Sequence, residues 1–391
     1  MKVRSLTMRH YRNYTDQTVV FDEGVNIFSG ENAQGKTNLI EALFFLSRGY
    51  SHRAVRKQEI ITFDESEMYV SAEVTRGDVR HNIRYKTDQS GKELTLDQKK
   101  AKHSQVSRTF PVILFEPDDL HIIKAGPERR RRFIDEELSE AIPAYRKVLK
   151  QYRRALKQRN ALLKAIRQDA TLTVMLDGWD EQLVTLGSKL ISYRLAYLKR
   201  LNTAAKKIHR ILSGEREELS LMYQNNVIDR PAYQRDIEKA FAEKIAESRE
   251  TDLEKGTSVT GPHLDDIVVM IGGREARRFG SQGQQRSAAI ALKLSQIDIY
   301  EALTGELPIV LLDDILSELD ESRQRNILKL IDRNQSVITC TNADFMRRHH
   351  PEGIAVFTVH DGVISQGEKG DQTEKLPSGT EDEKEDSQDI N

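Results

Sequence analysis

The sequence predicts an α/β protein in which two distant parts of the chain build one head and a helical lobe is inserted between them. Three observations predict this fold. Residues 25–46 indicate a short strand, a glycine-rich turn and a buried helix. Residues 308–314 form an apolar run that ends in two aspartates, which is typical of a buried parallel strand. Between them, residues 118–253 change to long, charged segments with apolar residues at helical spacing.

We therefore expect four parts along the chain. Residues 1–117 and 256–365 would form the head, with a parallel sheet and additional antiparallel strands, and residues 118–255 would form an all-helical lobe. Strands are expected at 19–28, 68–75, 79–86 and 112–115, and long helices at 138–167 and 179–212. Residues 366–391 carry nine acids and three lysines with almost nothing apolar, so we expect a disordered tail.

The turn at residues 30–37 (GENAQGKT) fits the phosphate-loop pattern G-x-x-x-x-G-K-[ST] at every fixed position. Its glycines let backbone N–H groups surround phosphate oxygens, and the helix that follows adds its dipole. Lys36 is expected to reach the β- and γ-phosphates of ATP, and the Thr37 hydroxyl to hold Mg²⁺. The nucleotide contacts expected from this segment are Gly30, Glu31, Asn32, Ala33, Gln34, Gly35, Lys36, Thr37 and Asn38.

The two aspartates at the end of the apolar run are the candidates for metal binding and hydrolysis. Asp313, at the carboxyl edge of the expected strand, is the natural partner of Mg²⁺, directly or through water. Asp314 could orient or deprotonate the attacking water. The alternative is that the acids cap a helix in an acidic turn. The catalytic candidates are therefore Asp314 and Lys36, and the metal candidates are Thr37 and Asp313.

Residues 281–286 (SQGQQR) are polar and precede an expected helix at 287–299, so they would form a second anion site at a helix N-terminus. A helix cap explains a serine and a glycine equally well. Placed after a phosphate loop and before an apolar-Asp-Asp strand, however, the segment resembles the signature of ABC-type ATPases. That resemblance implies nucleotide contacts from Ser281, Gly283 and Gln284 across a dimer, and it makes residues 317–320 a D-loop.

Several further segments resemble the RecF family, a DNA-repair branch of the ABC-type ATPases that includes SMC proteins. The resemblance covers residues 1 to about 365. Its segments are 11–14 (YRNY), 30–37 with Asn38 and Glu41, 51–53 (SHR), 115–120 (FEPDDL), 126–135 (GPERRRRFID) and 261–266 (GPHLDD). In the last of these, Leu264 stands where the family has arginine.

The resemblance implies a DNA replication and repair protein that binds double-stranded DNA at gaps or junctions. With RecR, and possibly RecO, such a protein promotes RecA loading in recombinational repair and the SOS response. It also implies an ATP-dependent homodimer. Two departures point to slow hydrolysis and to ATP as a switch: Asp314 stands where many relatives have glutamate, and the expected strand at 336–339 runs into residues 340–342 (CTN) without a histidine.

A basic stretch from 129 to 167 is the candidate DNA contact, because acids are sparse in it after Glu140. Its alternatives are a solvated helix face and, for residues 129–132, pairing with acids inside the head. The net charge of the whole chain is −1. Residues 366–391 carry −6, so residues 1–365 carry +5. With aromatic residues at only 6%, backbone contact with a duplex is favoured over stacking on single strands.

Composition predicts a cytoplasmic protein without a membrane partner. No apolar run approaches the roughly 18 residues of a membrane span, and the N-terminus lacks an apolar signal segment. The single cysteine, Cys340, lies in an apolar strand and is expected in the core. The alternatives are other ABC-type ATPases, either a transporter nucleotide-binding subunit or an SMC-like DNA-end protein, and a plain phosphotransferase. The last of these would leave residues 281–286 without a role.

Overall fold

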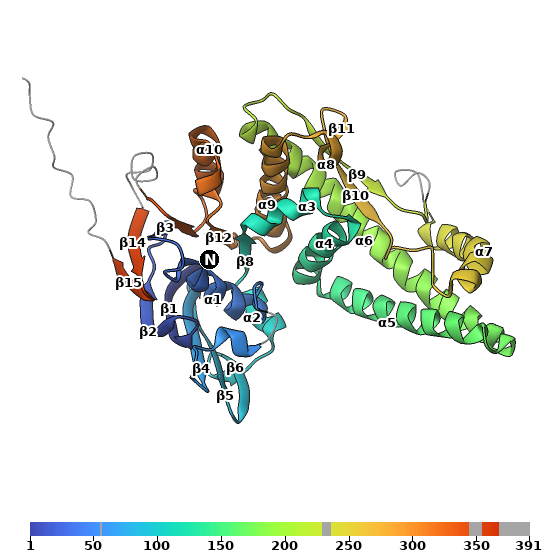
Figure 1. The fold of residues 1–391 in the computed structure, drawn as a ribbon, viewed down its shortest axis with the longest axis horizontal. Helices are drawn as coiled ribbons and strands as arrows, with labels where there is room; N and C mark the ends of the chain where they lie inside the picture. The colour runs from blue at the N-terminus through green and yellow to red at the C-terminus, as the bar shows by residue number, and fades with distance from the viewer. Residues whose placement is uncertain (55–56, 229–235, 344–353, 367–391) are drawn as a thin grey trace, which may run out of the picture.

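The computed structural model describes residues 1–54, 57–228, 236–343 and 354–366 (Figure 1). A head contains both ends of the described chain, and helices of the middle segment extend away from it (Figure 1). This arrangement confirms the predicted α/β class. The expected disordered tail lies outside the described residues, except for Gln366.

A six-stranded sheet forms the centre of the head, in the order β15-β14-β3-β13-β12-β8. All its strands are parallel except β15, which pairs antiparallel with β14. The strands are β3 (Val25–Ser29), β8 (Val112–Phe115), β12 (Ile309–Asp313), β13 (Ser336–Cys340), β14 (Ile354–His360) and β15 (Val363–Gln366). Strands β8, β12 and β13 are buried along their whole length, as expected for a parallel sheet covered on both faces.

Alternate residues of the parallel strands enter two different cores. Leu311 and Val337 pack with helix α1 (Lys36–Arg48), whereas Leu312 and Ile338 pack with α9 (Gln282–Thr304) and α10 (Glu321–Ile331). The period of two along each strand therefore places α1 on one face of the sheet and α9 and α10 on the other. The phosphate-loop helix and the helix that begins at the predicted signature thus flank the same sheet.

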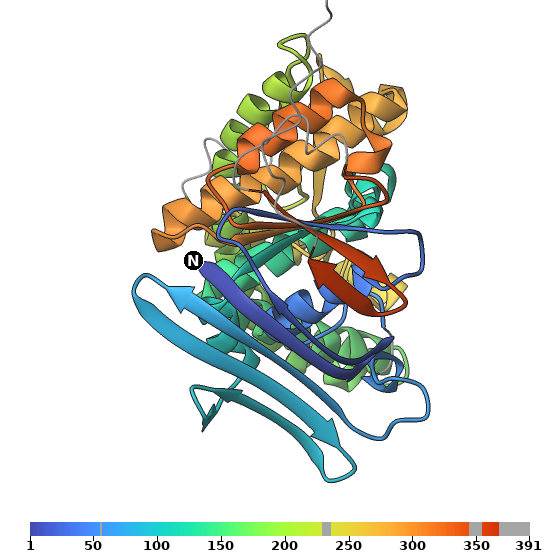
Figure 2. The same cartoon turned by 90° about the vertical axis from the view of Figure 1, so that its left-hand side faces the viewer.

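A second six-stranded sheet is antiparallel, in the order β2-β1-β4-β5-β6-β7 (Figure 2). Its strands are β1 (Lys2–Tyr11), β2 (Tyr14–Val20), β4 (Met68–Arg76), β5 (Val79–Asp88), β6 (Gly91–Leu96) and β7 (Lys99–Lys100), and α2 (His103–Thr109) leads back to β8. Its inward residues, among them Leu6, Val70 and Ile83, share a core with α1. This sheet holds α1 against the central sheet.

The lobe consists mainly of α3 (His121–Lys124), α4 (Pro127–Ala141), α5 (Pro143–Ile166), α6 (Leu176–Leu212) and α7 (Ile237–Lys255). It is not all-helical as expected. Strand β9 (Leu219–Gln224) lies within it and pairs antiparallel with β10 (Asp266–Ile271), which continues through β11 (Arg274–Glu275) and α8 (Ala276–Phe279) to α9. The pairing with β10 provides the backbone hydrogen bonds of β9. Because the partner strand is distant in the sequence, the helical periodicity of this segment could not indicate β9.

Two further predicted elements are each divided into two in the structure. The expected strand at 19–28 divides into β2 and β3, because Asn26 Oδ1 accepts from Asp22 N at 2.7 Å and turns the chain between them. The expected helix at 138–167 divides at Ile142, which adopts an extended conformation before Pro143.

Helix α6 joins the lobe to the head. Leu183, Leu190 and Leu201 pack in the core of the lobe, whereas Ile208 and Leu212 pack with α9 and α10 in the head. Its 37 residues correspond to about 55 Å of helix. Within the described parts of the chain, no helix is long and apolar enough to cross a membrane.

Candidate nucleotide-binding site

The phosphate loop connects β3 to α1 and has the backbone shape of an anion nest. Gly35 is the N-cap of α1 with φ 117°, and Ala33 has φ 66°. A side chain at Gly35 would be strained at this φ and would place its Cβ 2.7 Å from Asn13 Nδ2, so the position favours glycine. Lys36 is buried, and its Nζ donates to Gly30 O at 2.6 Å and Glu31 O at 2.7 Å. The ammonium therefore lies directly under the loop, where phosphate oxygens would accept from it.

Thr37 and Asp313 bring the loop and the acidic strand together. Thr37 Oγ1 donates to Asp313 Oδ1 at 2.9 Å, and Thr339 Oγ1 of the neighbouring strand donates to the same oxygen at 2.8 Å. Burial raises the pKa of the Asp313 carboxyl above its usual range, an effect that the two hydroxyl donors oppose. A hydroxyl and a carboxylate are hard oxygen ligands of the kind that Mg²⁺ prefers, so these residues fit the ion that ATP carries.

Asp314 adopts a strained conformation beside this pair. Its φ is 51°, and its backbone N–H donates to Thr339 Oγ1 at 3.0 Å. Its Oδ1 is buried without a hydrogen-bond partner among the described residues. The helix-cap alternative does not fit Asp314, because Ile315 takes the N-cap position of the 3₁₀ turn η4 (Leu316–Glu318). Strain and an unpartnered carboxylate oxygen are typical of a functional position.

The hairpin between β1 and β2 supports the loop from outside. Tyr14 Oη donates to Gly35 O at 2.9 Å, and Asn13 Nδ2 donates to Gln34 O at 3.0 Å. Arg12 binds the buried carboxylate of Glu41 on α1 with two hydrogen bonds of 2.7 and 2.8 Å. The segment YRNY, noted in the sequence only for its family resemblance, therefore fixes the loop to its helix.

The segment SHR approaches α1 from the other side. Ser51 Oγ donates to the Glu41 carboxylate, and Arg53 NH1 donates to Asn38 Oδ1 at 3.1 Å. Asn13, Asn38 and Arg53 line an open hollow of about 730 Å³ next to the phosphate loop. The hollow adjoins the first turn of α1 through Asn38, beside the expected phosphate site.

The predicted signature segment begins α9 and makes its hydrogen bonds elsewhere. Ser281 is the N-cap: its Oγ accepts from Gln284 N at 3.2 Å, while Gln284 Oε1 accepts from Ser281 N at 2.8 Å. Gln284 Nε2 donates to Glu217 Oε1 at 2.8 Å. A Cβ added at Gly283 would lie 3.5 Å from the Arg323 guanidinium. None of these partners belongs to the phosphate loop, so the fold does not bring the two predicted halves into contact within one chain.

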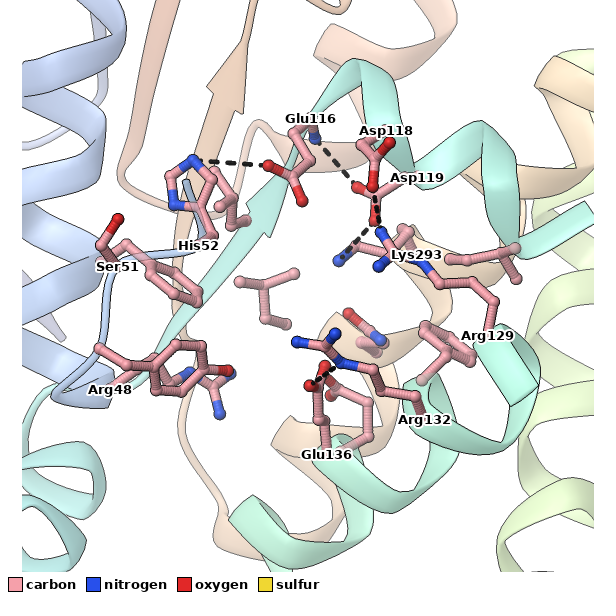
Figure 3. Close-up of a pocket in the computed structure, with 18 residues that line it drawn as sticks. Arg48, Ser51, His52, Glu116, Asp118, Asp119, Arg129, Arg132, Glu136 and Lys293 are labelled. Carbon is pink, nitrogen blue, oxygen red and sulfur yellow. Dashed lines mark hydrogen bonds and ion pairs between the residues drawn. The ribbon is translucent and has the colours of Figure 1, made fainter. Parts of the chain in front are cut away.

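A cavity of about 160 Å³ opens beside the end of β8, between α1, α4 and α9 (Figure 3). In it, His52 Nε2 lies 3.4 Å from Glu116 Oε2. Burial raises the pKa of Glu116 to about 7, with repulsion from Asp119 as a further cause, and burial lowers the pKa of His52 to about 4. His52 is therefore uncharged near neutral pH, where Glu116 is divided between its protonated and ionised forms.

The cations that line this cavity have acidic partners. Lys293 Nζ lies 3.3 Å from Asp119 Oδ1, and Arg132 Nε lies 2.7 Å from Glu136 Oε1; Arg129 pairs with Asp118 (Figure 3). The cavity thus lies between the head and the lobe, and each of these three cations is paired with a carboxylate. It lies one residue past β8, whose Phe115 pairs with Leu312 next to Asp313.

Two of the segments that resemble RecF, 126–135 and 261–266, contact each other. Arg130 of α4 binds the Asp266 carboxylate through Nε at 2.7 Å and NH2 at 2.8 Å, and Arg131 NH1 donates to Asp265 O at 2.6 Å. Residues 126–135 and 261–266 therefore form one joint between α4 and β10. Of residues 129–132, only Arg130 follows the alternative of pairing with an acid inside the head, because Arg131 donates to a backbone carbonyl and Arg129 and Arg132 pair with exposed carboxylates.

Helix α5 retains the exposed basic face of the predicted DNA contact. No acidic residue occurs in it. Arg159 is buried in an ion pair with Asp252, and Arg153 pairs with Asp135. The exposed cations on one side of the helix are Lys147, Lys150, Arg154, Lys157 and Lys164.

Some contacts of the site could not be found from the sequence. Thr339 has no motif of its own, and only the parallel register of β12 and β13 brings it to Asp313. Gln34 was expected as a nucleotide contact, yet its Oε1 accepts from Asp361 N at 2.6 Å, which joins the loop to the β14–β15 turn. Glu217 lies in a polar loop with no local signal. Each depends on a partner far away in the chain.

Comparison with known proteins identifies the family. Residues 2–365 match the family model described as the RecF/RecN/SMC N-terminal domain. The DNA replication and repair protein RecF of Clostridium tetani is 36% identical over 365 residues, which is 93% of this chain and 99% of the relative. The solved structure of the recombination mediator protein RecF with ATP, in the RecFOR pathway, has a TM-score of 0.82 and 34% identity, and it covers 93% of this chain and 97% of the other.

The fold and the nucleotide site define an ATPase head of the RecF/RecN/SMC class. An Smc head domain from Pyrococcus furiosus shares this fold, with a TM-score of 0.56 at 16% identity and coverage of 93% of this chain and 95% of the other. Within that class, the chain belongs to the RecF family of DNA replication and repair ATPases.

Proposed function

We propose that this chain binds ATP with Mg²⁺ at the phosphate loop and that two copies close around two nucleotides. The observation that carries the proposal is the 2.9 Å hydrogen bond between Thr37 and Asp313, which places the loop and the acidic strand at one point. The RecF relative solved with ATP supports the cofactor. Bound Mg²⁺ would neutralise charge that develops on the phosphates.

Each residue of the loop and strand has a separate task in this proposal. The loop amides and Lys36 bind the β- and γ-phosphates, while Thr37 and Asp313 hold the ion. Asp314 orients the attacking water and accepts its proton. Its carboxylate is one methylene shorter than the glutamate of many relatives, and no histidine follows β13 among residues 341–343. Hydrolysis is therefore slow, and ATP acts as a switch.

The dimer follows from the position of the signature segment. Ser281 and Gln284 are bonded to each other, and Gln284 is bonded to Glu217, so these hydrogen bonds do not involve the phosphate loop of their own chain. In a two-fold dimer, Ser281 and Gly283 of one copy would contact the γ-phosphate bound by the other. ADP lacks this phosphate, so it does not favour the closed state and the dimer opens.

Double-stranded DNA is the proposed macromolecular ligand, at gaps or junctions. The exposed cations of α5 can contact backbone phosphates without reading bases. The relative named for the RecFOR pathway supports partnership with RecR and RecO, and through them RecA loading in recombinational repair and the SOS response. In a dimer, two lobes would present their basic faces to one duplex.

Sedimentation of the full chain with ATP, with ADP and without nucleotide tests this proposal. We expect a dimer with ATP and a monomer in the other two states. Equal dimerisation in all three states would contradict the switch. Titration with a DNA duplex in the same three nucleotide states tests DNA binding, and we expect the duplex to bind more tightly with ATP.

A further inference from the structure

The loop between α6 and β9 makes a hydrogen-bonded link between the long helix and the signature segment. Glu217 in this loop uses both carboxylate oxygens. Oε1 accepts from Gln284 Nε2 at 2.8 Å, and Oε2 lies 3.2 Å from Nε2 of His209, a fully buried residue in the last turn of α6. The carboxylate therefore joins the end of one helix to the beginning of another.

Glu217 also determines which way the Gln284 amide points. Because Nε2 donates to Glu217, Oε1 is left to accept from Ser281 N at 2.8 Å. Ser281 Oγ in turn accepts from Gln284 N at 3.2 Å. A hydroxyl that accepts from the backbone keeps its own proton available for donation. The Ser281 hydroxyl is thus arranged to donate outward, toward an anion in front of α9.

The neighbourhood of this link is stiff. Gly272 N donates to Glu218 O at 2.9 Å, so the loop is continuous with the β9–β10 pair. Asn326 Nδ2 of α10 donates to Ile211 O at 2.9 Å and holds the same turn of α6. His209 and Leu212 are buried, so the end of α6 cannot shift without moving α9 or α10.

We propose that Glu217 is a positioning residue. It fixes Ser281 and Gln284 so that they can contact the nucleotide bound by a second copy of this chain, and it thereby links these contacts to helix α6. The inference rests on the proposed function, because the second copy supplies the nucleotide. It assigns to a loop glutamate outside all the recognised motifs a part in closing the dimer.

Glu217→Ala tests this role, with Glu218→Ala as the matched control. Glu218 is the next residue, with an exposed side chain that pairs with Lys206. For Glu217→Ala we expect the ATP-dependent dimer to form about tenfold more weakly, as expected for the loss of hydrogen bonds to a charged group. Binding of a fluorescent ATP analogue to the monomer should change less than about twofold, because the phosphate loop is untouched. Glu218→Ala should resemble the wild type in both measurements.

Glu217→Gln separates positioning from folding. Its amide oxygen can accept from Gln284 and its NH₂ group can donate to neutral His209, so it should restore most of the dimerisation that Glu217→Ala loses. Wild-type dimerisation in Glu217→Ala, an equal loss in Glu218→Ala, or no rescue by glutamine would each overturn the inference. If the wild type itself forms no ATP-dependent dimer, it is the proposed function that fails.

Discussion

Arg130 and Asp266, 136 positions apart in the sequence, are joined by two parallel hydrogen bonds of 2.7 and 2.8 Å. Both side chains are largely buried, with exposed fractions of 6% and 16%. This pair fastens α4 to β10 and so determines how the lobe meets the three-stranded sheet that precedes α9. The pair thus joins two segments, 126–135 and 261–266, that both resemble the RecF family.

Replacement of Arg130 by alanine should strongly destabilise the lobe. The change leaves the Asp266 carboxylate buried without its partner, which costs about 3 to 5 kcal/mol. Urea denaturation followed through Trp179, the single tryptophan, measures the loss in the lobe. Arg132→Ala is the control, because the Arg132–Glu136 pair is exposed and worth under about 1 kcal/mol. Similar losses in the two variants would contradict the structural role of the buried pair.

Glu116→Gln should change the pH dependence of stability. The folded protein holds a proton on Glu116 up to about pH 7, whereas the unfolded chain loses it near 4.5. Stability therefore falls as pH rises between these values, and the penalty is complete above pH 7. Glutamine has no such penalty.

We expect the variant to gain about 1 to 2 kcal/mol relative to the wild type between pH 5 and pH 8, after allowance for solvent at the carboxyl. Thermal denaturation at several pH values measures this difference. Glu243→Gln, at an exposed carboxylate of α7, is the control. A difference between Glu116→Gln and the wild type that stays constant with pH would count against the raised pKa.

Lys36→Arg should impair hydrolysis far more than binding. The Lys36 ammonium is buried under the loop between two carbonyl oxygens, where a planar guanidinium cannot take the same position. We expect at least a hundredfold loss of ATP hydrolysis and a change in ATP affinity of about fivefold or less. Steady-state phosphate release and nucleotide titration give the two values. Loss of both to the same degree would show that Lys36 serves binding alone.

Replacement of Lys150 and Lys157 by alanine should weaken duplex binding and reduce its salt dependence. Each lost phosphate contact lowers the slope of log affinity against log salt by about 0.9, so the double variant should lose about 2. Fluorescence anisotropy across salt concentrations measures the slope. Lys92→Ala with Lys99→Ala, on the exposed β6–β7 hairpin of the head, is the control. An unchanged slope in the α5 variant would place the DNA elsewhere.

The sequence predicts those elements whose signals are local. The apolar runs of β8 and β12 were located because strands of a fully covered sheet are apolar throughout. Helix α9 was located because Ser281 caps a periodic apolar segment. Strand β9 was missed, because its alternating LSLMYQ pattern needs β10, which begins 42 residues after β9 ends, to become a strand.

The residues of the candidate site also divide into those with a local sequence signal and those without one. The loop, Asp313 and the signature segment were found from motifs that are complete within a few residues. Thr339 and Glu217 contribute single side chains from chain segments that only the folded sheet and helix ends bring near. The run of four arginines was ambiguous for a related reason, since the acids that pair with Arg129 and Arg130 lie outside the run.

The central claim, that two chains share each nucleotide, is tested most directly by mixing two inactive variants. Lys36→Ala removes the phosphate contact of one chain, and Ser281→Arg blocks the signature of the other. A mixed dimer would still contain one site with an intact loop and an intact signature. We predict that neither variant alone dimerises with ATP, as measured by sedimentation, and that the mixture does. A mixture that stays monomeric, while the wild type dimerises, would contradict the shared site.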